Sequence, residues 1–389
     1  MQTARLFSKC ALPISACLLI ACAREGRQPR TPGAAEPHAE ASVAVPRTLV
    51  TPDEAVGVDQ LYARAEQELA RGDTKRAAED FERVARSAVD EPLAPRAWLR
   101  ASEAREQLGE RSAAIARLEQ LVRRHSDHPL AGEALVRLIR LYAYLENWQR
   151  AGWAASRLLP IVDELSPIDQ VVVYGGKGLA LVFAGDPDAA EYFVEKGRNV
   201  VDSYQLDRAG RLPRDLAQLY FALGEIRRAR AERIDFVPPP PSFPVALEQR
   251  CQLLLDAQSA YSDAMRAYDA HWSTMAGYRV GELYQSLHDD LTSLPPPPTA
   301  DTPQRRLLFE GAMRLRYAVL LEKARAMLDH TLAMAERTDE RSRWVERTRA
   351  ARAHIDRSIA RESSVIDSLP FSRDELQSAL NQLSERAQK

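Results

Sequence analysis

Residues 61–84, LYARAEQELARGDTKRAAEDFERV, contain the pattern that predicts the fold. Apolar residues recur there at helical spacing, on one face of a first helix, at Leu61, Ala65 and Leu69. Gly72-Asp73 follows and permits a tight turn, because glycine adopts positive φ without a clash at Cβ. The apolar stripe resumes on a second helix at Ala77, Phe81 and Val84. The stretch therefore predicts two antiparallel helices that pack against each other.

This two-helix pattern returns along the chain. The small residue of the second helix recurs at spacings of 37, 37, 39 and 39, at Ala77, Ala114, Ala151, Ala190 and Ala229. The turn position stands five residues earlier each time, at Gly72, Gly109, Glu146, Gly185 and Gly224. Since repeats of this length determine the whole architecture, we predict about five helix pairs over residues 58–237, the last with its turn at Gly224.

The fourth and fifth units depart from the pattern. A large apolar or aromatic residue stands sixteen residues before the alanine in four units, at Leu61, Trp98, Leu135 and Tyr174. Pro213 breaks this series in the fifth unit, where Arg233 also stands at an expected apolar position. Gly175-Gly176 lies inside the predicted first helix of the fourth unit. The first three units therefore match best.

The repeated pattern resembles the tetratricopeptide repeat, in which large apolar, small and aromatic residues, a turn glycine and a closing proline recur along ~34 residues. Pro92 and Pro129 close two of the units here. The unit in this chain is longer by roughly three to five residues, and this variant resembles outer-membrane lipoproteins of β-barrel assembly. The resemblance implies an all-α solenoid of antiparallel helix pairs.

The first helices of tetratricopeptide proteins line an inner face that often binds an extended or helical peptide. The family's positions, carried over to this sequence, place two rows and two further residues on that face: Asp59, Arg96 and Glu133; Glu66, Glu103 and Arg140; Gln107 and Tyr144. Their mixed signs favour specific paired contacts with a protein or peptide. They are equally compatible with an ordinary solvated surface.

The N-terminus has the layout of a secretory signal. Basic Arg5 and Lys9 precede a short apolar run that ends in Leu19-Ile20-Ala21-Cys22. This end resembles the lipobox of bacterial lipoproteins, which implies that residues 1–21 are removed and that Cys22 is lipidated. Ala23 after the cysteine favours the outer membrane by analogy. An ordinary cleaved signal and an uncleaved cytosolic N-terminus are the alternatives.

The segments that flank the repeats differ in composition. Residues 22–57 contain few large apolar groups and are predicted to form a disordered tether. Residues 238–244 are a Pro-rich linker, and residues 245–370 again show helical periodicity, so a second domain of long helices is expected there. Residues 371–389 are predicted to form a short C-terminal helix.

Within this second half, residues 247–294 predict one helix or two, with Gly277 and Gly281 as weak points. Further helices are expected over residues 304–337 and 340–363. Residues 280–284 and 320–324 resemble the two helices of one degenerate tetratricopeptide hairpin with a long loop between them. Ser372 and Glu375 are spaced as a capping box at the start of the last helix.

Several short runs could suggest chemistry that their context does not support. Residues 174–178, YGGKG, lack the spacing and the Ser or Thr of a phosphate-binding loop and fall on a predicted helix. His125, Asp127 and His128 have no further ligand at metal spacing and are predicted to lie in a loop. Arg227, Arg228, Arg230 and Arg233 form a basic cluster that we expect to pair with nearby acids rather than with phospholipid.

The composition also limits the function. A net charge of −2 without a basic region argues against nucleic acid. Cys251, the thiol left outside the signal and the lipobox, is expected to be a buried small apolar residue. No catalytic constellation, metal site or cofactor motif is found in the sequence. We therefore expect a non-enzymatic protein with no cofactor.

The combination of lipobox, repeats and C-terminal helices resembles tetratricopeptide lipoproteins of myxobacteria, some of which serve gliding motility. The resemblance implies a lipid-anchored scaffold at the periplasmic side of the outer membrane, which binds envelope proteins or peptide segments in a gliding-motility or other trans-envelope complex. An accessory lipoprotein of β-barrel assembly is the alternative scaffold. A cell-wall enzyme with accessory repeats is the alternative of another class.

Overall fold

The computed structural model describes residues 57–87, 92–208, 213–237, 239–240 and 242–386. Most of these residues lie in helices, and none of them lies in a strand. Cys22 and the signal lie outside the described residues, as does the predicted tether apart from Gly57. Among the helices described here, none is long and apolar enough to cross a membrane.

The N-terminal part consists of short helices. They are α2 (Val58–Ala70), α3 (Thr74–Ser87), α4 (Leu93–Gln107), α5 (Arg111–Arg124), α6 (Leu130–Tyr144), α7 (Trp148–Leu158), the 3₁₀ helix η2 (Leu159–Glu164), α8 (Pro167–Phe183) and α9 (Pro187–Tyr204). The C-terminal part consists of longer helices: α10 (Leu216–Glu232), α11 (Phe243–Arg266), α12 (Ala270–Thr292), α13 (Pro303–Arg337), α14 (Arg343–Asp367) and α15 (Arg373–Arg386).

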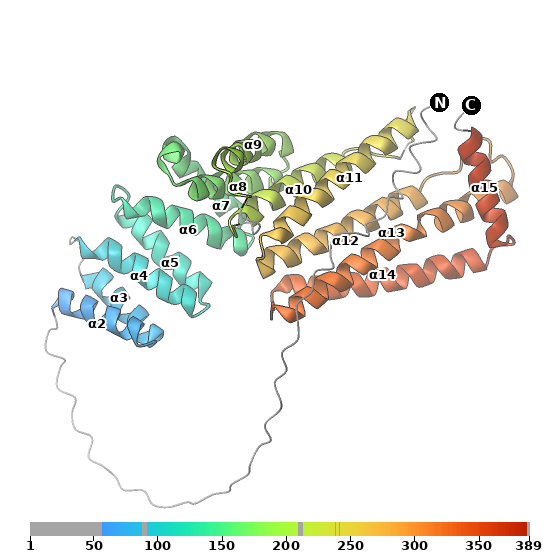
Figure 1. Ribbon diagram of the computed structural model, residues 1–389. Helices are drawn as coiled ribbons and strands as arrows, with labels where there is room; N and C mark the ends of the chain where they lie inside the picture. Colours follow the sequence, from blue (N-terminus) through green and yellow to red (C-terminus); the bar gives the residue numbers. More distant parts are fainter. Residues whose placement is uncertain (1–56, 88–91, 209–212, 238, 241, 387–389) are drawn as a thin grey trace, which may run out of the picture.

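Four helix pairs follow the predicted repeat. Each helix packs on its neighbour in the chain, and the pairs stack side by side from α2 to α9 (Figure 1). The turn glycines Gly72, Gly109 and Gly185 have φ of 84°, 76° and 88°, values that explain why glycine recurs there. The third turn reaches φ 57° with Glu146 in that position. The predicted pairs and their turns are confirmed for these four units.

The prediction of a fifth turn at Gly224 is wrong. Helix α10 runs through this glycine without interruption and pairs with α11 instead. A Cβ on Gly224 would lie 2.5 Å from the ring of Tyr261 on α11. Tyr261 is fully buried, and its hydroxyl donates a hydrogen bond to Glu225 at 2.7 Å. Glycine is therefore needed here for close helix packing and not for a turn.

The weak points expected at Gly277 and Gly281 are also wrong, since α12 is continuous through both. The break in the region falls earlier, between α11 and α12, where Tyr268 has φ 55°. A Cβ on Gly277 would lie 2.1 Å from Thr331 Oγ1, and one on Gly281 would lie 2.7 Å from Leu328. The two glycines thus let α13 pack closely on α12, and these helices form the predicted hairpin with a long loop.

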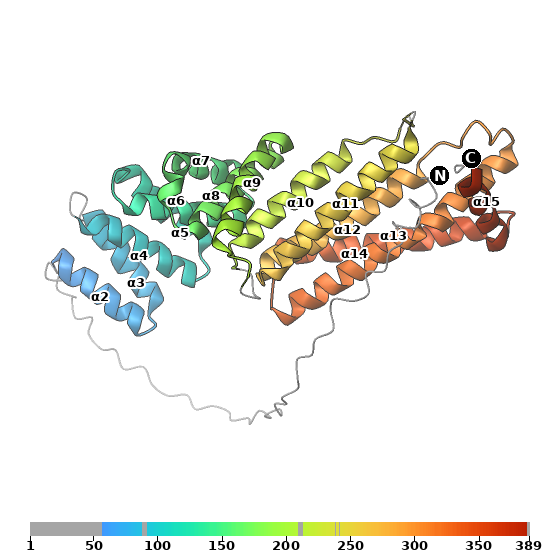
Figure 2. The same cartoon turned by 45° about the horizontal axis from the view of Figure 1, so that its top comes forward.

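Long helices α11 to α14 lie side by side, and α15 crosses their far end (Figures 1 and 2). The predicted capping box of α15 is confirmed. The backbone N–H of Ser372 donates to Glu375 at 2.7 Å, and that of Glu375 donates to Ser372 Oγ at 3.2 Å. Two backbone donors at the start of this helix are thereby satisfied.

One apolar core joins the short and the long helices. Buried residues from α8, α9 and α10 pack in the same cluster as Tyr261, Met275 and Trp344 of α11, α12 and α14. Phe236, just before the Pro-rich segment, is 1% exposed and packs edge-on against Phe243 just after it. The Pro-rich segment therefore separates helices while the packing continues across it.

Candidate protein-binding face

Ion pairs connect the first helices of the repeats. Arg100 on α4 bonds both carboxylate oxygens of Glu66 on α2, at 2.8 and 2.5 Å, and also bonds Glu103 at 2.7 Å. Such a bidentate pair fixes the geometry of both side chains. The hydrogen bond from Arg100 lowers the pKa of Glu66 below its usual value. Glu66 and Glu103 are therefore already partnered within the molecule.

The series of ion pairs continues along the array. Arg137 on α6 bonds Glu103 at 2.6 Å and lies 3.3 Å from Glu133 on its own helix. One turn further on, Arg140 bonds Asp169 on α8 at 2.9 Å and Asp215, next to the start of α10, at 2.7 Å. Together these pairs connect five helices from α2 to α10 along one side of the stack.

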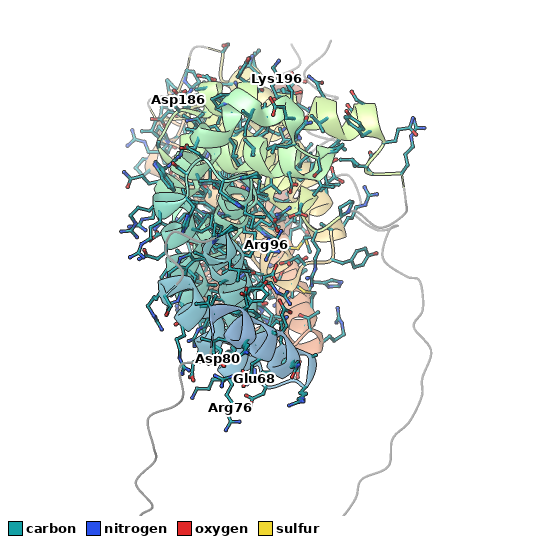
Figure 3. The ribbon with its side chains drawn as sticks, turned by 90° about the vertical axis from the view of Figure 1, so that its left-hand side faces the viewer. Glu68, Arg76, Asp80, Arg96, Asp186 and Lys196 are labelled. Carbon is teal, nitrogen blue, oxygen red and sulfur yellow. The ribbon has the colours of Figure 1, made fainter. Side chains whose placement is uncertain are left out.

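The predicted face thus contains residues of two kinds. Glu66, Glu103 and Arg140 bridge neighbouring helices, whereas Asp59, Arg96 and Gln107 are exposed on α2 and α4. Figure 3 shows Arg96 midway along the array, between Glu68, Asp80 and Arg76 on one side and Asp186 and Lys196 on the other. The exposed residues can contact a partner. The bridging residues connect the helices on which the exposed residues lie.

Tyr144 makes a contact that the repeat pattern does not predict. Its ring stacks on His271 of α12, with ring centroids 3.8 Å apart, and Arg111 lies over the ring at 4.1 Å. His271 is 3% exposed, and burial lowers its pKa below the usual 6.5. Two residues after Tyr144, Glu146 bonds Arg343 of α14 at 2.5 Å. The long helices therefore dock on the turn between α6 and α7.

Another surface, which the sequence reasoning missed, surrounds Trp153 on α7. Trp153 is 45% exposed and stands two residues after the repeat position Ala151. Tyr192 is 60% exposed at the equivalent position, two residues after Ala190. The sequence signal was the recurrence of an aromatic residue on a position that does not belong to the apolar stripe.

The runs that suggested other chemistry lie where the sequence predicted. Residues 174–178 are inside α8, where a Cβ on Gly176 would lie 2.4 Å from Ile139. His128 is in the loop before α6 and accepts a hydrogen bond from the backbone of Leu130 at 3.1 Å. No three His, Cys, Asp or Glu side chains in the described ranges are grouped to hold a metal ion.

The predicted pairing of the basic cluster on α10 is confirmed for three arginines. Arg228 bonds Glu225 at 2.9 Å, and Arg230 bonds Glu191 on α9 at 2.6 Å. Arg233 bonds Asp188 at 3.1 Å. Arg230 and Arg233 therefore join α10 to α9, whereas Arg228 pairs within α10.

No family model and no curated protein matches the chain. Among solved structures, it is similar to a tetratricopeptide repeat protein from Parabacteroides merdae, at 16% sequence identity and a TM-score of 0.35. The match covers 75% of this chain and 98% of that one. By its own helices and turns, this chain is an all-α, tetratricopeptide-like solenoid of antiparallel helix pairs that continues into a second set of long helices.

Proposed function

We propose that this protein is a lipid-anchored, non-enzymatic scaffold that binds a protein partner on the first-helix face of its repeats. It would act at the periplasmic side of the outer membrane, in a gliding-motility or other trans-envelope complex. The lipobox-like end at Leu19-Ile20-Ala21-Cys22 supports the anchor. Stacked helix pairs support the binding role, because such arrays present extended surfaces that suit polypeptide partners.

The observation that carries the proposal is that some charged residues of this face pair between helices, whereas others are exposed to solvent. Partly exposed ion pairs contribute only about 0.2–1 kcal/mol each, but the pairs around Arg100 and Arg137 fix the positions of three neighbouring helices. Asp59 on α2 and Arg96 on α4 are exposed on these connected helices and carry opposite charges. A partner with complementary charges would meet groups that are already positioned, which reduces the ordering cost of binding.

The test is co-purification from crosslinked membranes. Charge reversal at the exposed residues, in the variant Asp59→Arg with Arg96→Glu, should remove a partner that the wild type retains. Glu103 and Arg140 are unsuitable for this test, because their reversal would break bonds between helices. Lys75→Glu on α3, also exposed, is the matched control and should keep the partner. A partner that is retained by the double variant would contradict binding at this face.

A further inference from the structure

Two adjoining recesses lie against the exposed side of α7. The first, of about 580 Å³, is bounded by α5, α6 and α7. The second, of about 910 Å³, lies between α7 and α8 and is closed on one side by Arg343 of α14. Gln149 and Trp153 border both recesses, so the two form one continuous surface. We call this the Trp153 surface; its cations are Arg123, Arg150, Arg157, Lys177 and Arg343.

The Trp153 surface is rich in accessible aromatic area. The indole of Trp153 is 45% exposed, and the guanidinium of Arg157 lies 5.7 Å from its ring centroid. In the second recess, Trp148 stacks on Phe183 with centroids 4.5 Å apart and the planes at 4°. Half-exposed tryptophan and arginine are the side chains that most often dominate protein interfaces.

The charges on this surface are unbalanced. Its five cations face two carboxylates, an excess of three positive charges in a chain whose net charge is −2. Both carboxylates are already engaged, since Glu119 bonds Arg150 and the Tyr142 hydroxyl, and Glu146 bonds Arg343.

Three cations on this surface remain uncompensated. Within the described part of the chain, Arg123, Arg157 and Lys177 have no carboxylate within 4 Å. Lys177 donates a hydrogen bond to Ser156 at 2.9 Å, which leaves its charge unneutralised.

The arrangement recurs on the next outer helix. On α9, Lys196 lies 5.7 Å from the ring of Tyr192, as Arg157 lies from Trp153, and each cation follows its aromatic residue by four positions. Lys177 on α8 lies 5.8 Å from the ring of Phe193, beside Tyr192, and also bonds α7 through Ser156. Aromatic–cation pairs therefore continue from one repeat to the next.

We propose that the Trp153 surface binds an acidic peptide segment of a partner protein, with an apolar or aromatic side chain of that segment in a recess beside Trp153. The carboxylates of the segment would face Arg123, Arg157 and Lys177. A recess can accept a side chain of a bound peptide. A site that binds a lipid surface instead has side chains of the protein that project toward the lipid. This surface is built by α5 to α8 on the side of Trp153 and is separate from the Arg96 face, so the two sites are tested independently.

The test uses a fluorescein-labelled acidic peptide, EEDWEED, and fluorescence anisotropy on the purified chain from residue 23 onward. We expect saturable binding that weakens as salt increases, and no binding of the basic peptide KKRWKKR. Trp153→Ala and Arg157→Glu should each weaken binding by roughly tenfold or more. Both side chains are substantially solvent-accessible, so neither change removes a core contact.

Matched controls are Tyr204→Ala, an aromatic side chain that is 58% exposed at the end of α9, and Arg71→Glu beyond α2. Both should bind the acidic peptide as the wild type does. Absence of saturable binding by the wild type, or equal binding by the Trp153 and Arg157 variants, would overturn the proposal. So would Trp153-dependent binding to phosphatidylglycerol vesicles without binding to the peptide, since the surface would then recognise lipid.

Discussion

The ring of Tyr144 lies 3.8 Å, centroid to centroid, from the imidazole of His271, and the two planes differ by 21°. These residues are 127 positions apart and belong to α6 of the third repeat and to α12 of the long helices. Glu340, just beyond α13, lies 3.9 Å from His271 Nδ1. The contact thus brings three distant segments together at the α6–α7 turn.

Acidification should weaken this contact. Burial lowers the pKa of His271 from 6.5, and so does nearby Arg111, while Glu340, Asp269 and Glu146 oppose the shift. Because the folded pKa is the lower one, the unfolded chain takes up the proton first as pH falls below about 6.5, and the free energy of unfolding decreases. Urea denaturation at about pH 7.5 and about pH 5.5 measures the loss. His271→Phe keeps a ring for the stack and should lose less stability on acidification than the wild type; an equal loss would contradict the prediction.

Gly224→Ala should destabilise the protein, because the added Cβ would meet the buried ring of Tyr261 at 2.5 Å. We expect a decrease of about 1–3 kcal/mol in the free energy of unfolding. Gly132→Ala is the matched control, since a Cβ on this glycine of α6 meets nothing within 4 Å. Alanine there should stabilise the helix by up to about 1 kcal/mol. Thermal denaturation followed by circular dichroism distinguishes the two variants, and the same sign of effect for both would be inconsistent with the packing described.

Glu146 should be more easily replaced by glycine than by alanine. Either change removes the bonds to Arg343 and Arg347, but only glycine relieves the backbone at φ 57°. Left-handed backbone costs an L-residue about 1–2 kcal/mol, so Glu146→Gly should be more stable than Glu146→Ala by about 1 kcal/mol. Denaturant midpoints of the two variants give this difference. Equal midpoints would mean that the turn does not require a left-handed residue.

Cys22→Ser should fold normally and lose its association with membranes, if lipid is attached at this residue. Fractionation of cells into membrane and soluble protein measures the change, and circular dichroism of the purified variant checks the fold. Cys251→Ser, a change at a thiol in α11, controls for loss of a cysteine elsewhere. Retention of the Cys22 variant in the membrane fraction would show that the anchor was assigned incorrectly.

Local sequence was sufficient for the first four helix pairs because their turns depend on a single residue. Gly72, Gly109 and Gly185 reach positive φ, and the apolar stripe repeats around each of them. The same reasoning failed at Gly224, which occupies the identical sequence position. What differs is Tyr261, 37 residues later, whose ring needs the space that a Cβ would fill. A contact with a separate helix is not visible in a local pattern.

The predicted face shows a similar limit. Its positions on the first helices were predicted from the repeat, but the partners of Glu66 and Glu103 are arginines that the pattern did not single out, Arg100 and Arg137. The Trp153 surface was missed because a tryptophan in a periodic apolar helix usually belongs to the core. Its exposure depends on how α7 is oriented against α6 and α8.

The length of α13 determines how far α15 lies from the repeats. Its 35 residues span about 50 Å at 1.5 Å per residue. Toward the N-terminal end of α13, Gly311 lies against Leu376 of α15. Beyond its C-terminal end, Glu340 lies close to His271, which stacks on Tyr144 at the α6–α7 turn. The stretch of helix from Gly311 to Arg337 therefore keeps the α15 contact about 40 Å from the end of α13 that lies near the α6–α7 turn. The C-terminal half thus acts as a rigid spacer between the repeats and α15.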